Sequence, residues 1–126
     1  MCIFVVDADQ SARKGLARLL RAASYDVREY ASLPDFLETL DSGANGCLLL
    51  DLGMQELPCE ELQEELKIRD LHFPIIMIAA DDDPATRRKA LQMNAAGFFH
   101  KPIDGTALLD AIAWALRSNS PAGQPN

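Results

Sequence analysis

Two aspartates and one lysine stand where their charges could serve phosphoryl chemistry. Asp7, Asp51 and Lys101 each directly follow a short, largely apolar run. The three runs are residues 3–6, 47–50 and 97–100. Such runs are typical of strands covered on both faces in a parallel sheet, and the ligands of these sheets lie beyond the carboxyl ends of the strands. We therefore expect the three charged groups to converge on a site for a cation and a phosphoryl group.

Strand-like and helix-like segments alternate along the whole chain, which predicts an α/β fold. Strands are expected near residues 3–6, 26–30, 47–50, 75–79 and 97–100, and helices near residues 11–23, 32–40, 58–70, 84–93 and 106–117. Ser32 is expected to cap the second helix, and Pro84 to occupy the first turn of the fourth. We expect residues 1–117 to form one domain. Residues 118–126, rich in polar residues, Pro and Gly, would be a linker or a frayed end.

The helix expected at residues 11–23 has two distinct faces. The predicted core face consists of Ala12, Leu16, Leu19, Leu20 and Ala23. The opposite face carries Arg13, Lys14, Arg18 and Arg21. Two interpretations of this basic face stay open: a solvated helix surface, or a docking surface for an acidic partner.

Length and composition exclude several classes of protein. The chain has 126 residues, 48% of them hydrophobic, which suits one domain with a real core. No apolar run reaches the roughly 18 residues of a membrane span, and no signal peptide follows Met1, so we expect a cytoplasmic protein. The net charge of −7 argues against direct nucleic-acid binding. The three cysteines lack zinc-site spacing, and we expect Cys47 to be a small core residue.

The order and spacing of three motifs resemble the receiver domain of bacterial two-component response regulators. These motifs are Val5-Val6-Asp7, Leu50-Asp51-Leu52-Gly53-Met54 and Lys101-Pro102. The details are most similar to the FixJ/LuxR-type group. The resemblance implies a flavodoxin-like (βα)5 sandwich with a five-stranded parallel sheet of order 2-1-3-4-5, in which Asp7 and Asp51 are neighbours.

The resemblance also implies a role for each site residue. Asp51 would accept a phosphoryl group from a sensor histidine kinase, and Lys101 would offset the charge that develops. Asp7, Asp51 and the backbone carbonyl of Gly53 would hold Mg²⁺. The Lys101–Pro102 bond could be cis, as in the family. The protein would be regulatory rather than an enzyme, and would control transcription through a DNA-binding domain absent from this sequence.

Two groups of residues depart from the family pattern. Ala8 stands where a second acid usually contacts the metal, so we expect Mg²⁺ to bind weakly. Asp9 is either a further candidate ligand or a solvated acid near the next helix. The switch positions, usually a hydroxyl residue and an aromatic residue, are Ala79 and Phe98. The acidic residues 81–83 could repel a phosphoryl donor, or simply form a solvated loop.

Three classes of function therefore compete. The first is a phosphoaccepting receiver, and the second is a degenerate receiver that binds partners without phosphorylation. A flavodoxin-like electron carrier or small enzyme is the third, but no flavin-phosphate loop or Ser/His or Cys/His constellation supports it. Trp114 lies on the polar side of its predicted helix and could anchor a dimer or partner interface. The resemblance implies that this interface would combine the helix at 84–93, the strand at 97–100 and the helix at 106–117.

Overall fold

The computed structural model describes most of the chain, in six segments. They are residues 2–39, 46–51, 59–69, 73–80, 84–92 and 95–118. Several residues named above lie outside these segments: Gly53, the acidic run 81–83, and the tail from residue 119 onwards. The side chain of Cys59 is also outside the description.

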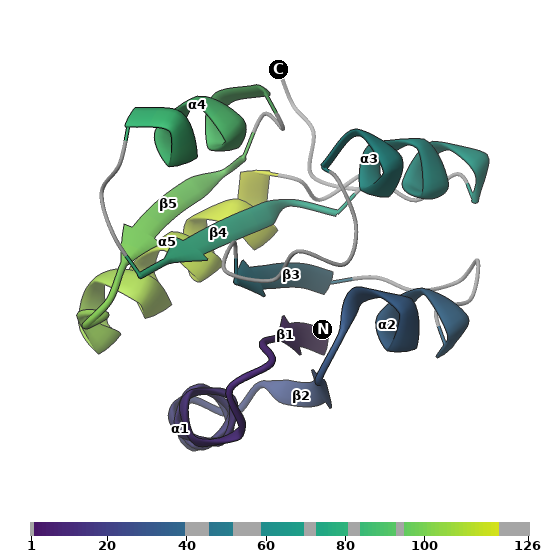
Figure 1. Cartoon of the computed structure of the whole chain (residues 1–126). Helices are drawn as coiled ribbons and strands as arrows, with labels where there is room; N and C mark the ends of the chain where they lie inside the picture. Colours follow the sequence, from purple (N-terminus) through teal and green to yellow (C-terminus); the bar gives the residue numbers. More distant parts are fainter. Residues whose placement is uncertain are drawn as a thin grey trace.

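Five strands form one parallel sheet, with helices between them (Figure 1). The elements are β1 (Cys2–Val6), α1 (Gln10–Ala22), β2 (Asp26–Tyr30), α2 (Leu33–Thr39), β3 (Gly46–Asp51), α3 (Cys59–Ile68), β4 (Ile75–Ala79), α4 (Pro84–Gln92), β5 (Gly97–His100) and α5 (Gly105–Ser118). The strand order is β2-β1-β3-β4-β5, and every pair is parallel. The predicted α/β fold and strand order are confirmed.

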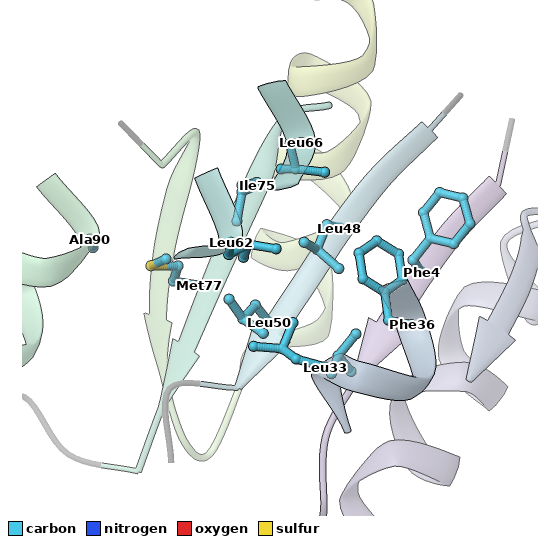
Figure 2. Packing of buried hydrophobic residues seen from close by; sticks show 11 residues of the cluster. Phe4, Leu33, Phe36, Leu48, Leu50, Leu62, Leu66, Ile75, Met77 and Ala90 are labelled. Carbon is cyan, nitrogen blue, oxygen red and sulfur yellow. The ribbon is translucent and has the colours of Figure 1, made fainter. Parts of the chain in front are cut away.

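The helices form two layers, one on each side of the sheet, because successive residues of a strand point to opposite faces. Ile3 and Val5 of β1 pack in a cluster with residues of α1 and α5. Phe4 and Val6 pack in the other cluster, with residues of α2, α3 and α4. Figure 2 shows this second cluster, in which the ring of Phe4 meets that of Phe36 edge-on at 5.5 Å between centroids. Burial on both faces explains why β1, β3 and β4 are almost entirely apolar, whereas β2 at the edge of the sheet carries charged residues.

Local sequence sets the ends of several elements as predicted, with one error in α1. The Ser32 hydroxyl accepts a hydrogen bond from the Asp35 amide at 3.2 Å and so caps α2. In α1, Leu16, Ala17 and Leu20 are buried. The predicted core face lacks Ala17, which the structure buries. The prediction that Ala23 belongs to the core is wrong, because the helix ends at Ala22 and Ala23 is exposed at its C-cap. Cys47 is fully buried, as predicted.

The start of β3 requires a glycine. Gly46 has a φ of 154°, and a Cβ placed there would lie 1.7 Å from the Cys2 carbonyl oxygen. This close approach lets β3 run directly beside β1, with Cys2 opposite Gly46 and Val6 opposite Leu50. The register that brings the ends of β1 and β3 together therefore begins at this glycine.

Candidate functional site

The carboxyl ends of three strands bring Asp7, Asp51 and Lys101 together. Asp51 is the last residue of β3, Asp7 follows β1, and Lys101 follows β5. The Lys101 ammonium nitrogen lies 3.5 Å from Asp7 Oδ2 and 3.6 Å from Asp51 Oδ2. The predicted convergence of the three charges is therefore confirmed, although β1, β3 and β5 are distant in sequence.

Lys101 is held at the edge of the site by its own backbone. Its amide donates a hydrogen bond to the Ala79 carbonyl oxygen at 2.9 Å, which continues the pairing of β4 with β5. The Lys101–Pro102 peptide bond is cis, as expected. The lysine side chain keeps 30% of its surface exposed, so its ammonium group can meet a group that arrives from solvent.

The Asp7 carboxylate is almost completely buried, with 1% of the residue exposed. Its Oδ1 accepts a hydrogen bond from the Asp9 amide at 2.9 Å. Within the described part of the chain, Oδ2 accepts no hydrogen bond. Burial raises the pKa of Asp7 most, and the neighbouring Asp51 carboxyl raises it further. The Asp9 amide and the Lys101 charge act in the opposite direction.

Two facing carboxylates and a buried oxygen without a donor suit a hard divalent cation. Mg²⁺ commonly binds proteins through one or two carboxylates and keeps several waters. Asp7 and Asp51 would supply those carboxylates. The described residues contain no group of three or more acidic, histidine or cysteine side chains that could hold a metal. The Asp7 and Asp51 carboxylates, both at the Lys101 ammonium, fit a magnesium ion that is held by few protein ligands. Gly53, the expected carbonyl ligand, lies outside the described residues.

The residues after Asp7 differ in their suitability as ligands. Ala8 is exposed and offers no side-chain oxygen. Asp9 is the N-cap of α1, and its Oδ1 accepts a hydrogen bond from the Ser11 amide at 3.0 Å. Asp9 was expected to be either a metal ligand or a solvated acid near the next helix, and this capping geometry agrees with the second interpretation. Its carboxylate stabilises the helix terminus.

The two switch positions lack the usual polar groups. Ala79 is buried at the end of β4 and presents only a methyl group. Phe98 is half-buried in β5, and the Arg87 guanidinium carbon lies 5.6 Å from the centre of its ring. Phe98 also lines a cavity of about 210 Å³ between α4 and β5, together with Arg87, Ala90, Leu91, Ala95 and Gly97.

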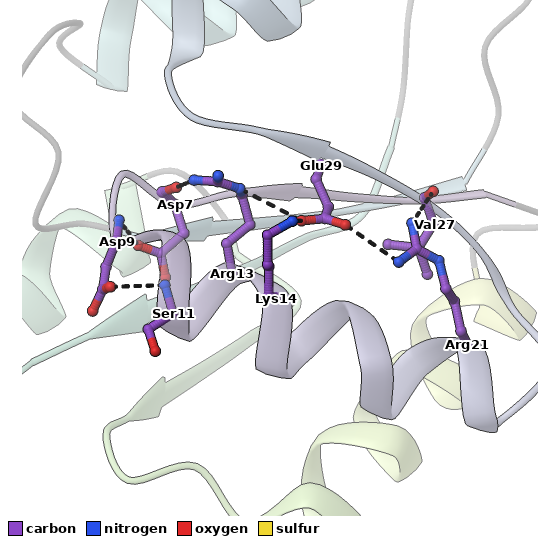
Figure 3. A network of polar contacts seen from close by, with 8 residues as sticks. All are labelled: Asp7, Asp9, Ser11, Arg13, Lys14, Arg21, Val27 and Glu29. Atoms are coloured by element: carbon purple, nitrogen blue, oxygen red, sulfur yellow. Dashed lines mark hydrogen bonds and ion pairs between the residues drawn. The ribbon is translucent and has the colours of Figure 1, made fainter.

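The basic face of α1 is largely engaged within the molecule, and sequence reasoning missed its partner. Arg13, Lys14 and Arg21 all lie within ion-pair distance of Glu29 on β2 (Figure 3). Glu29 shares the strand face of Val27, which packs with the α1 side of the sheet. The sequence signal that could have revealed this ion-pair partner is an acid on the inward face of a strand next to a helix with four basic residues.

The expected exposure of Trp114 is observed. Trp114 on α5 has 55% of its surface exposed, while Leu108 and Ile112 of the same helix are buried. On α4, Leu91 is 81% exposed. None of the helices in the described segments is long and apolar enough to cross a membrane.

Comparison with known proteins agrees with this geometry. Residues 3–113 match the response regulator receiver domain. The transcriptional regulatory protein TdiR of Thauera aromatica is 38% identical over 117 residues, which cover 93% of this chain and 52% of TdiR. FixJ of Azorhizobium caulinodans is 29% identical over 122 residues, which cover 97% of this chain and 58% of FixJ. The structure of the response regulator StyR has a TM-score of 0.84 at 38% identity, covering 98% of this chain and 62% of StyR.

These matches confirm the resemblance seen in the motifs, including the likeness to the FixJ group. The chain spans about half the length of TdiR and somewhat more of FixJ. On the match across residues 3–113, the chain belongs to the family of response regulator receiver domains.

Proposed function

We propose that this receiver accepts a phosphoryl group on Asp51 from a phosphohistidine of a sensor histidine kinase. The observation that carries the proposal is the meeting of Lys101 with both Asp7 and Asp51 at 3.5 and 3.6 Å. A nucleophilic carboxylate, a neighbouring carboxylate and a cation are the groups that phosphoryl transfer to an aspartate needs. The domain would comprise residues 1–117, followed by a linker or tail.

In the proposed step, a carboxylate oxygen of Asp51 attacks the phosphorus atom. The new P–O bond forms as the P–N bond breaks, and the histidine nitrogen keeps the bonding electron pair. Lys101, at the solvent edge of the site, donates hydrogen bonds to a phosphoryl oxygen and offsets the negative charge that gathers there. The hydrogen bond from the Lys101 amide to the Ala79 carbonyl oxygen holds the backbone from which this lysine extends.

Asp7 and Asp51 would hold Mg²⁺, with the Gly53 carbonyl as a further ligand. When bound, the ion reduces the repulsion between the carboxylates and an incoming phosphoryl dianion. Asp7 Oδ2 supports this assignment: it lies 3.5 Å from the Lys101 ammonium but accepts no hydrogen bond within the described residues, so it has capacity left for a metal ion. Ala8 removes one family ligand, which supports weak binding.

The biological setting belongs to the same proposal. The receiver would regulate transcription in the cytoplasm through an attached output domain; its relative TdiR is a transcriptional regulatory protein. It would not bind nucleic acid itself, and it would act as a regulatory phosphoacceptor whose only catalysis concerns its own phosphoryl group. Exposed Trp114 and Leu91 support a homodimer through α4, β5 and α5.

A phosphate-independent interaction module is the alternative. It is favoured by Ala8 and by Ala79, which lacks the hydroxyl that would close on a phosphoryl oxygen. Against it, Asp7, Asp51 and Lys101 are intact and in contact. A receiver that had lost its chemistry would have no need to keep a buried, repelling carboxylate pair. We therefore favour phosphorylation, with a conformational response that does not use the hydroxyl and phenol of typical members.

The test is intact mass after incubation with acetyl phosphate and Mg²⁺. We expect the chain to gain one phosphoryl group, and Asp51→Asn to gain none because its carboxamide is not a nucleophile for phosphorus. Exposed Asp104→Asn is a matched control that removes a different carboxylate and should be labelled like the wild type. No adduct on the folded wild-type chain, with acetyl phosphate or with a cognate kinase, would favour the interaction module.

A further inference from the structure

We infer that Arg13 positions Asp7 for the cation, and that Glu29 in turn holds Arg13. Neither residue belongs to the set of site residues identified from the sequence motifs. The inference rests on the proposed function, because it concerns the cation that the phosphoacceptor site would use.

Arg13 reaches from the first turns of α1 back to the end of β1. Its Nη1 donates a hydrogen bond to the Asp7 carbonyl oxygen at 2.7 Å. Its Nε lies 3.6 Å from Glu29 Oε1, and the side chain has only 14% of its surface exposed. One planar guanidinium group therefore links the backbone of the site residue to an acid on the neighbouring strand (Figure 3).

This link fixes the orientation of the Asp7 carboxylate. The backbone carbonyl is held by Arg13, and Oδ1 is held by the Asp9 amide at 2.9 Å. With both groups engaged, Oδ2 is left to face Lys101 and Asp51. Partners behind a metal ligand set its direction and strongly affect metal affinity. Here that effect should be large, since Ala8 leaves Asp7 as the one acidic side chain at the end of β1 that faces the site.

Glu29 holds the Arg13 side chain in place. Its carboxylate is 19% exposed and also meets Lys14 at 3.9 Å and Arg21 at 3.2 Å. Arg21 donates to the Val27 carbonyl oxygen as well, at 3.3 Å. Arg13 and Arg21 thus lie on the same helix and meet the same acid, and each donates to a backbone carbonyl oxygen. Only the acceptor of Arg13, Asp7, is a site residue. Arg21 is therefore a matched control for the loss of a charge and of a Glu29 contact.

The experiment compares Mg²⁺ binding in the wild type, Arg13→Ala, Arg21→Ala and Glu29→Gln, followed by amide NMR during a Mg²⁺ titration. We expect Arg13→Ala to raise the Kd for Mg²⁺ by about tenfold, as is typical when a partner behind a metal ligand is lost. Glu29→Gln should raise it by a smaller factor, and Arg21→Ala should leave it unchanged. In metal-free protein, hydrogen exchange at the Asp9 amide should be faster in Arg13→Ala than in the wild type, and unchanged in Arg21→Ala.

Each outcome bears on the inference. A wild-type Kd in Arg13→Ala, an equal loss in Arg13→Ala and Arg21→Ala, or a wild type that binds no Mg²⁺ would overturn it. Should Arg13→Ala fail to fold, Glu29→Gln still tests the positioning of Asp7 through Arg13. A wild-type Kd for Mg²⁺ in Glu29→Gln, together with unchanged exchange of the Asp9 amide, would count against the inference. Phosphorylation of the wild type by acetyl phosphate is measured separately. An unphosphorylated wild type whose Mg²⁺ affinity depends on Arg13 would contradict the proposed function and support the positioning role.

Discussion

Replacing Asp7 with asparagine tests whether the carboxylate pair is unfavourable without a cation. The substitution keeps Oδ1 as the acceptor for the Asp9 amide and replaces Oδ2, which accepts no hydrogen bond within the described residues, with an NH₂ group. That group can donate to the Asp51 carboxylate, where the wild type has a second negative charge. The fold and the packing around residue 7 should be unchanged, because the two side chains have nearly the same shape.

The expected magnitude follows from three terms. At 3.5 Å and an effective dielectric constant of about 20, the Lys101–Asp7 attraction is about 5 kcal/mol. Loss of the Asp7 charge removes this attraction but also the repulsion from Asp51, which has the opposite sign and a similar size. The remaining term is the unsatisfied buried oxygen, which costs about 1–3 kcal/mol. We therefore expect Asp7→Asn to be more stable than the wild type by about 1–2 kcal/mol in EDTA, or roughly 4–8 °C in Tm.

Thermal and denaturant unfolding in EDTA and in Mg²⁺ measure the effect. At a concentration ten times its Kd, Mg²⁺ should stabilise the wild type by about 1.4 kcal/mol and leave Asp7→Asn unchanged. Asp104→Asn is the control, because Asp104 is exposed and caps α5, a position where asparagine is equally suitable. A variant that is less stable than the wild type in EDTA would contradict the account, and would mean that Lys101 fully compensates the buried charge.

The pH dependence gives an independent check on Asp7. The native pKa of Asp7 is raised above its unfolded value of about 3.9, so the native state binds more protons between these two pKa values. Wild-type stability without metal should therefore fall as the pH rises through that window. Asp7→Asn should lack this contribution, which the difference between the two pH profiles isolates.

Two further predictions concern the scaffold and the surface. Gly46→Ala should destabilise the chain by about 3 kcal/mol or more in denaturant unfolding, because its Cβ meets the Cys2 carbonyl oxygen and its φ is unfavourable. Gly15→Ala, with open space around its Cβ in α1, should instead stabilise by about 1 kcal/mol, and equal effects of the two changes would contradict the close approach at β3. Trp114→Ala should weaken self-association in sedimentation experiments by at least about tenfold if it anchors the interface, while unfolding stability changes little; unchanged association would remove Trp114 from the interface.

The sequence alone determined the fold class and the three central site residues. Apolar runs that end in Asp7, Asp51 and Lys101 indicate strands buried on both faces, and parallel strands align their carboxyl ends. Local chemistry was equally readable at Ser32, which caps α2, since capping depends on neighbouring residues only. Trp114 was expected to be exposed from helix periodicity, and it is.

Tertiary structure alone decided how the charges pair. The basic face of α1 is compatible with solvent or a partner when the helix is considered by itself. Only the packing of α1 beside β2 shows that Glu29 draws Arg13 inward to the Asp7 carbonyl. In the same way, the sequence predicted that Asp7 is close to Asp51 but not that one of its oxygens is buried without a donor. Helix and strand periods are local properties, whereas an ion pair or an unsatisfied oxygen depends on side chains from several segments meeting within a few ångströms.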